Sequence, residues 1–187
     1  MRLRGTSTRY GPVAQAFHWS TVVLVLLAYL LSVGGPELRI YTPAMDGARR
    51  LHETLGIIVF VTVLLRLLWR LFDTPPSSPP GPVWMTWSAR LAHLALYSLL
   101  VAIPATAIMG IWYQGHPLTF LGFDIAPKIG AKHDLGQVII EIHRTLGNVI
   151  LWVAGIHAAA ALLHHFYFRD DVLKSMMPGR VSKPSRW

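Results

Sequence analysis

Two nearly identical six-residue stretches of the sequence each carry a histidine as their second residue. They read LHETLG at residues 51–56 and IHRTLG at residues 142–147. Because neighbouring residues set the surroundings of a side chain, the repeat predicts similar positions for His52 and His143 on two different segments. Imidazole is a common ligand of iron, copper and zinc ions. The matched pair therefore indicates a metal or haem site.

Two further histidines extend this pattern to a second level. His157 follows His143 by 14 residues. On an α-helix this spacing turns the chain by about 1400°, about 40° short of four full turns, so both imidazoles project from one face, about 21 Å apart along the axis. His18 lies near the start of the first apolar run. With helices that alternate in direction, His52 matches the level of His143, and His18 matches the level of His157.

The elements that carry these histidines are expected to cross a membrane. Only 14% of the residues are charged, against about 25% in an ordinary soluble domain. Crossing the hydrocarbon core takes about 20 apolar residues. Four segments meet this requirement, at about residues 13–33, 53–72, 91–113 and 137–168. The sequence therefore predicts an all-α, integral membrane four-helix bundle that forms one domain over residues 1–187.

The distribution of basic residues predicts the direction of the four spans. Four spans place both termini on one side, which then holds eleven of the 17 lysines and arginines, while the other side holds six. The positive-inside rule assigns the richer side to the cytoplasm, so both termini are predicted to be cytoplasmic. The net charge of +8 is explained in this way by membrane topology, and no nucleic-acid partner is expected.

Facing imidazoles from two helices suit a six-coordinate haem b, in which each helix supplies one axial ligand. The chain has no cysteine, which excludes covalent c-type haem, thiolate zinc sites and iron–sulfur clusters. Gly56 and Gly147 follow the outer histidines by four residues and leave room on the same helix face for a flat macrocycle. Arg49, Arg50 and Arg144 flank these histidines and are candidate partners of the haem propionates.

Each feature also has a simpler explanation. A single membrane histidine can form a hydrogen bond between helices, a glycine can allow close helix packing, and arginines can anchor a span at the membrane boundary. Four histidines at matched depths are harder to explain separately, because an ionisable group inside a membrane is costly unless it is partnered. No role is assigned to His93, His164 or His165, and no catalytic residue is predicted.

Four stretches of the sequence carry a resemblance to a known family. They read AFHWST, LHETLG, LAHLALY and IHRTLGNVILWVAGIHAAAALLHHFYFRDDVLKSMMP. Through them the chain resembles, over nearly its whole length, the prokaryotic cytochrome b561 family of di-haem, four-helix inner-membrane proteins. The resemblance implies two haem b groups per chain. It also implies four axial iron ligands in two pairs, His52 with His143 and His18 with His157.

The resemblance also implies a function. A multi-pass protein of the bacterial inner membrane, surrounded by lipid, would transfer electrons between a periplasmic donor and the quinone pool, with ubiquinone as the acceptor. The donor would be a small molecule such as superoxide, which makes the chain a superoxide:quinone oxidoreductase, or a periplasmic redox protein. Two alternatives remain open: a quinone-linked cytochrome b membrane subunit of a periplasmic dehydrogenase, and a haem-free scaffold or metal-binding membrane protein.

Overall fold

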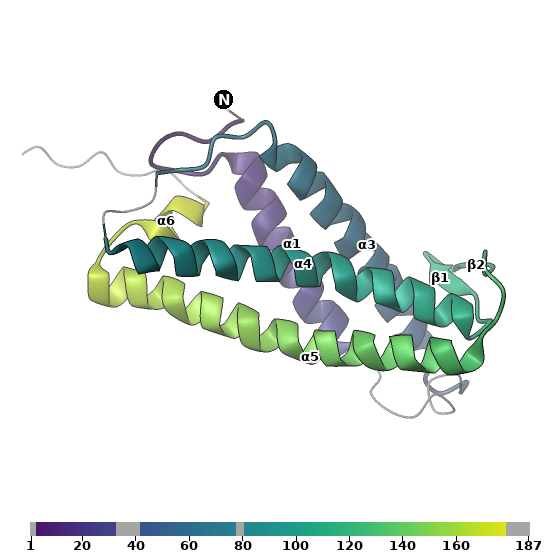
Figure 1. Cartoon of the computed structure of the whole chain (residues 1–187). Helices are drawn as coiled ribbons and strands as arrows, with labels where there is room; N and C mark the ends of the chain where they lie inside the picture. Colours follow the sequence, from purple (N-terminus) through teal and green to yellow (C-terminus); the bar gives the residue numbers. More distant parts are fainter. Residues whose placement is uncertain (1–2, 33–41, 78–80, 179–187) are drawn as a thin grey trace, which may run out of the picture.

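The computed structural model describes residues 3–32, 42–77 and 81–178, and four long helices dominate it (Figure 1). The last residue of the first predicted span, Val33, lies outside the described residues. In chain order the elements are α1 (Pro12–Leu30), α3 (Asp46–Arg70), α4 (Val83–Tyr113), β1 (Leu118–Phe120), β2 (Phe123–Ile125), α5 (His133–Leu163), the π-helix η1 (His164–Phe168) and α6 (Val172–Met176).

All four long helices have the length and composition needed to cross a membrane, which confirms the predicted number of spans. They are α1, α3, α4 and the continuous helix made of α5 and η1. Large apolar side chains project outward from them; Trp152 is 76% exposed and Leu94 is 64% exposed. In water such an apolar surface would favour aggregation, whereas the equally apolar tails of lipids can cover it. The helix α4 begins before its apolar segment, because hydropathy reports contact with lipid and not the ends of a helix.

The helices pack in two pairs that cross each other: α1 lies against α3, and α4 lies against α5 (Figure 1). Close packing within the second pair depends on glycine. A Cβ atom at Gly110 would lie 2.7 Å from Ile140 Cδ1, and one at Gly136 would lie 2.8 Å from the Gln114 backbone nitrogen. Small residues at such positions let two helix backbones approach closely.

The two pairs meet in a small apolar core at mid-height. Val59 and Val63 of α3, Leu100 of α4 and Ile150 of α5 are buried together there. This core separates two ends of the bundle, and each end holds histidines.

One end, which we call the hairpin end, carries a short antiparallel hairpin formed by β1 and β2, with Thr119 opposite Asp124. Its turn residues Leu121 and Gly122 have φ angles of 49° and 87°. Two successive positive φ angles are typical of the type I′ turn that joins tightly paired strands. The hairpin therefore closes the connection between α4 and α5 directly over this end of the bundle.

The other end, which we call the terminal end, joins the first and last described segments of the chain. The backbone N–H of Tyr10 donates to the carbonyl of Ser175 at 3.2 Å, and Trp19 Nε1 donates to the carbonyl of Met176 at 3.0 Å. These carbonyls belong to the end of α6, where a helix leaves its acceptors without partners. The assignment of this end to the cytoplasm stays a prediction.

Candidate functional site

The structure brings His52 of α3 and His143 of α5 together at the hairpin end. Their ring centroids are 6.2 Å apart and their planes are inclined by 84°. Two imidazoles bound to opposite sides of one metal ion should have centroids about 6 Å apart, which is twice the sum of a bond of about 2 Å and a ring radius of about 1.1 Å. The observed separation therefore suits one metal ion held between the two rings.

A hydrogen bond to a backbone carbonyl fixes each of these imidazoles. His52 Nδ1 lies 2.7 Å from the carbonyl oxygen of Ala28, and His143 Nδ1 lies 2.8 Å from that of Ile103. Because a carbonyl only accepts, each Nδ1 carries the proton and donates, which leaves a lone pair on each Nε2. Donation from the second ring nitrogen to a carbonyl is the usual support of a metal-bound histidine.

The carbonyl of Ala28 is available for a local reason. It belongs to the last four residues of α1, whose carbonyls have no donor within a regular helix. The two donors that follow, the N–H groups of Leu31 and Ser32, bond to Leu27 and Tyr29 instead. A side chain of α3, His52, thus supplies the hydrogen-bond donor that the carbonyl of Ala28 lacks at the end of α1.

A cavity of about 770 Å³ adjoins both histidines and is lined by all four long helices and by Leu118 of β1. Gly56 and Gly147 line it, and a Cβ atom at either position would meet no protein atom within 4 Å. Close helix packing, which explains Gly110 and Gly136, therefore does not explain these two glycines. They leave open space beside each histidine, as the flat face of a macrocycle would require.

Two arginines line the cavity near the histidines. They are Arg49 and Arg144, and Arg144 Nη1 also donates to Glu141 Oε2 at 2.9 Å. Arg50 has another environment: its Nη2 donates to the carbonyl of Gly122 at 2.9 Å and lies 3.4 Å from Asp124 Oδ1. The structure therefore places Arg49 and Arg144 toward the cavity and Arg50 toward the hairpin, and cofactor binding by Arg50 and Arg144 stays a prediction.

A buried carboxylate next to His52 ties the hairpin to α3. Glu53 is only 7% exposed. Its Oε1 accepts from Arg49 Nη1 at 2.7 Å and its Oε2 accepts from the Thr119 backbone N–H at 2.7 Å. The Leu121 N–H donates to Thr54 Oγ1 at 3.2 Å. Sequence reasoning did not identify this connection, although an acidic residue beside a membrane histidine is a signal for a buried partner.

Three histidines converge at the terminal end. The rings of His93 and His157 are 5.3 Å apart between centroids, at 64°. His18 lies within electrostatic reach of both, and its Nδ1 is 3.2 Å from Arg66 Nη2. The sequence predicted the pair His18 and His157; the structure places both at this end and adds His93 beside His157. The ligand assignment stays a prediction.

The remaining membrane histidines lie where α5 ends in the π-helix η1. His164 Nδ1 is 2.5 Å from Asp170 Oδ2, while the buried His165 Nδ1 has no hydrogen-bond partner among the described residues. Nor does the described part of the chain contain a group of three or more histidine, aspartate and glutamate residues arranged to hold a bare metal ion. The paired imidazoles instead suit a group that brings most of its own metal ligands, as a porphyrin does.

Comparison with known proteins gives several similar chains. Cytochrome b561 homolog 1 from Escherichia coli (strain K12) is 32% identical over 177 residues, covering 92% of this chain and 98% of the relative. Cytochrome b561 homolog 2 from the same organism is 32% identical over 182 residues, covering 95% of each chain. A probable superoxide oxidase, CybB, from Yersinia pestis is 30% identical over 172 residues, covering 91% of this chain and 96% of the relative.

A family model described as prokaryotic cytochrome b561 matches residues 9–179, which include all four long helices and both groups of histidines. Proteins of this family are multi-pass and lie in the inner membrane, and the family name implies haem b. The four apolar helices, the facing imidazoles and the relatives that match over nearly their full length agree with this result, and the chain belongs to the prokaryotic cytochrome b561 family.

Proposed function

We propose that this protein binds two haem b groups and transfers electrons across the inner membrane between a periplasmic donor and the quinone pool. The observation that carries the proposal is the geometry of His52 and His143, with centroids 6.2 Å apart and both Nδ1 atoms donating to carbonyls. When bound, haem would supply one-electron chemistry, and His52 and His143 would hold its iron.

The residues of the hairpin end have separate tasks in this proposal. His52 and His143 offer their Nε2 atoms as the axial ligands, and the carbonyls of Ala28 and Ile103 hold both rings in the required tautomer. Gly56 and Gly147 leave the space beside the ligands open. The cavity is lined mostly by apolar side chains, and its two arginines offer positive charge to the haem carboxylates.

We propose superoxide as the donor and ubiquinone as the acceptor, because one relative is named a probable superoxide oxidase. The hairpin end would face the periplasm and the terminal end the cytoplasm, as the basic residues predict. When the purified protein is mixed with superoxide, its haem spectrum should change to that of the reduced form. Added ubiquinone should then reoxidise the haem. Reduction by a co-purified periplasmic protein, with no response to superoxide, would contradict this choice of donor.

Spectroscopy on single-residue variants tests the ligands. The purified protein should show the Soret and reduced α bands of b-type haem, at two haems per chain. His52→Ala and His143→Ala should each remove the same spectral component, since the two residues share one iron. His18→Ala and His157→Ala should each remove the other component.

His93→Ala is the matched control, because the His93 ring lies beside that of His157, at 5.3 Å between centroids, but His93 is not a predicted ligand. It should retain both components. Loss of the terminal-end component in His93→Ala, with the component retained in His18→Ala, would replace His18 by His93 as the ligand. A protein that shows no bound haem after incubation with excess haem and removal of the unbound haem would refute the proposed function.

A further inference from the structure

We propose that Arg66 and Arg70 of α3, together with Tyr97 of α4, form an anion-binding site at the terminal end, and that its ligand is the pair of propionate carboxylates of the haem bound there. The proposal rests on the proposed function, because it takes the second haem as bound. It assigns a role to two arginines that the sequence pattern explained only as markers of topology.

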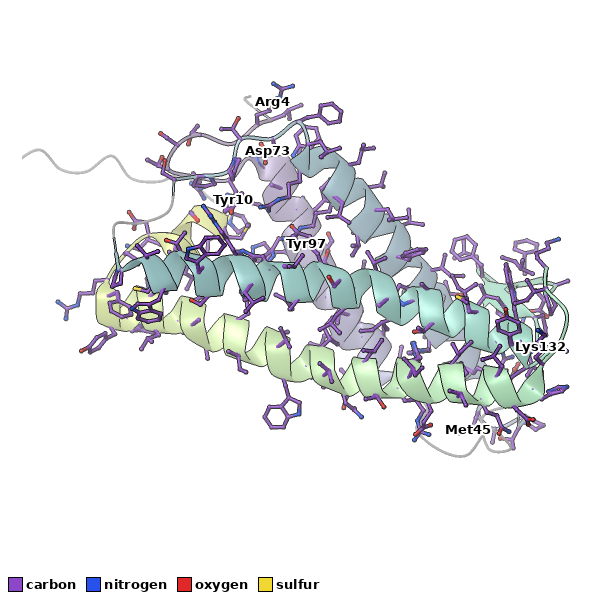
Figure 2. The ribbon with its side chains drawn as sticks, in the orientation of Figure 1. Arg4, Tyr10, Met45, Asp73, Tyr97 and Lys132 are labelled. Carbon is purple, nitrogen blue, oxygen red and sulfur yellow. The ribbon has the colours of Figure 1, made fainter. Side chains whose placement is uncertain are left out.

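The three side chains are already gathered. The guanidinium carbon of Arg66 lies 5.3 Å from the centroid of the Tyr97 ring, and that of Arg70 lies 5.7 Å from the same centroid. Two positive charges thus share one aromatic ring. Figure 2 shows Tyr97 of α4 on the side of that helix where Tyr10, from the segment before α1, also lies.

Neither guanidinium has a carboxylate at ion-pair distance within the described residues, although Asp73 is near enough to interact electrostatically with the same Tyr10. Arg66 and Arg70 form no ion pair there, whereas Arg49, Arg50 and Arg144 all do. Asp73, which follows the end of α3, accepts a hydrogen bond from the Gly5 N–H at 2.8 Å. Because a charge within a membrane span is costly unless it is partnered, this arrangement favours an anion supplied from outside the chain.

The neighbouring tyrosine does not supply that anion. Tyr10 lies close enough to Arg70, Arg66 and Tyr97 to interact with them electrostatically. Burial nevertheless raises the pKa of the Tyr10 phenol above its ordinary value, so the group stays protonated. A protonated phenol is a hydrogen-bond donor, and it adds a donor to a site that already has cations.

The contact between Arg66 and His18 is incompatible with iron binding by His18. A guanidinium only donates, so His18 Nδ1 accepts in this contact and the proton of the neutral ring is on Nε2. Iron binding through Nε2 would move that proton to Nδ1, where two donors would face each other. Iron binding through Nδ1 would use the lone pair itself. Either way, Arg66 must leave His18 when His18 becomes a ligand.

The released guanidinium is then beside the ligand and needs an anion. Haem b carries two carboxylates at one edge, and arginine binds carboxylates through two parallel hydrogen bonds. A lipid phosphate offers the same chemistry, but lipid headgroups lie at the membrane surface. Arg66 touches a predicted iron ligand and lies within electrostatic reach of His157, so it is at the depth of the haem. This location favours the haem carboxylates.

Haem and its dimethyl ester, which lacks the two negative charges, distinguish these sources. The full-length chain, prepared without haem and placed in nanodiscs of neutral lipid, is titrated with each compound. In the wild type, esterification should weaken binding at the terminal end by roughly tenfold or more, as expected for the loss of a hydrogen bond to a charged group. In Arg66→Gln, which leaves Arg70 in place, haem should bind more weakly than in the wild type, and its advantage over the ester should shrink.

The matched control is Arg90→Gln. Arg90 also stacks on an aromatic ring of α4, at 5.3 Å from the centroid of Trp87, but it forms no part of the cluster. It should discriminate between haem and ester as the wild type does. Arg66→Lys, which keeps the charge but loses the planar group, should lie between the wild type and Arg66→Gln. Undiminished haem binding at the hairpin end in the same samples shows that each variant is folded.

Three outcomes would overturn the proposal. One is an Arg66→Gln variant that still prefers haem to its ester by the wild-type factor. Another is that the wild type binds haem and its ester equally well, while Arg66→Gln contains less haem than the wild type only in nanodiscs with phosphatidylglycerol. That result would assign the arginines to lipid. A wild-type chain that takes up one haem or none would overturn the proposed function together with this inference.

Discussion

The two ends of the bundle hold the same kind of side chain in opposite hydrogen-bonding states. At the hairpin end, His52 and His143 donate from Nδ1 to carbonyls, and their Nε2 lone pairs border a cavity. At the terminal end, His18 accepts at Nδ1 from Arg66, and His93 lies against His157. The first arrangement is ready for a metal between the rings, whereas the second must change before iron can bind.

The difference shows that histidine at the right depth is not sufficient for a ligand site. What distinguishes the ends is the partner of the other ring nitrogen: a carbonyl fixes the useful tautomer, and a guanidinium fixes the other one. A preorganised site needs no rearrangement before its ligand binds. The hairpin end should therefore bind haem more tightly than the terminal end, which must first break a contact.

The largest expected effect of this difference is on the order in which haem binds. When haem is titrated into the haem-free full-length chain, the first equivalent should bind at the hairpin end, with an affinity severalfold that of the second. The terminal end must first break the contact between Arg66 and His18, and the new partner of Arg66 offsets only part of that cost. The spectral component lost in His143→Ala should therefore appear before the one lost in His157→Ala. Simultaneous appearance of both would show that the two ends are equally ready.

An effect on one end alone is expected from filling the open space beside a ligand. Gly147→Leu should abolish most haem binding at the hairpin end, because the added side chain projects into the cavity. Gly155→Leu is the matched control: Gly155 lies on the same helix, is exposed and has equally open surroundings, but it does not line the cavity. Haem content per chain, measured as the pyridine haemochrome, separates the variants. An equal loss of haem in both variants would show that the substitution acts through the helix itself and not by filling the cavity.

The smallest expected effect concerns the scaffold that supports His52. Glu53→Gln should lower the thermal midpoint of the protein by several degrees, because it removes the charge from a buried pair and costs about 1–3 kcal/mol. The side chains of Arg49 and Glu53 are 11% and 4% exposed. The exposed pair of Arg144 and Glu141 provides the control, and Glu141→Gln should leave the midpoint unchanged. Equal shifts would mean that burial does not strengthen the pair at the hairpin end.

Periodicity and hydropathy were enough to predict the spans and to bring His52 and His143 together. The apolar segments report directly which helices contact lipid, and the LHETLG and IHRTLG repeat places two histidines at equal depth. Equal depth does not fix how a helix is rotated about its axis. For that reason the approach of His93 to His157 was not predicted.

Rotation also explains why Arg49 lines the cavity while Arg50, which was predicted as an equal candidate, does not. Adjacent residues on a helix point about 100° apart, and here that difference turns the Arg50 side chain toward the hairpin. The hairpin was beyond prediction because its strands have three residues each, and Leu121 occupies a turn position with positive φ that usually favours glycine or asparagine. Arg66 carried a usable signal, since an arginine within an apolar run requires a partner.

The carbonyl anchors of His52 and His143 have a consequence for the assembly of the whole bundle. Each anchor crosses within a packed pair, from α3 to α1 and from α5 to α4, and neither acceptor is a side chain. Every amino acid has a backbone carbonyl, so a substitution at Ala28 or Ile103 cannot remove the acceptor. Such a mutation can break these hydrogen bonds only by shifting a helix. A single iron held between the two imidazoles would join one helix pair to the other, so haem binding would add a covalent bridge to the apolar core that the pairs already share.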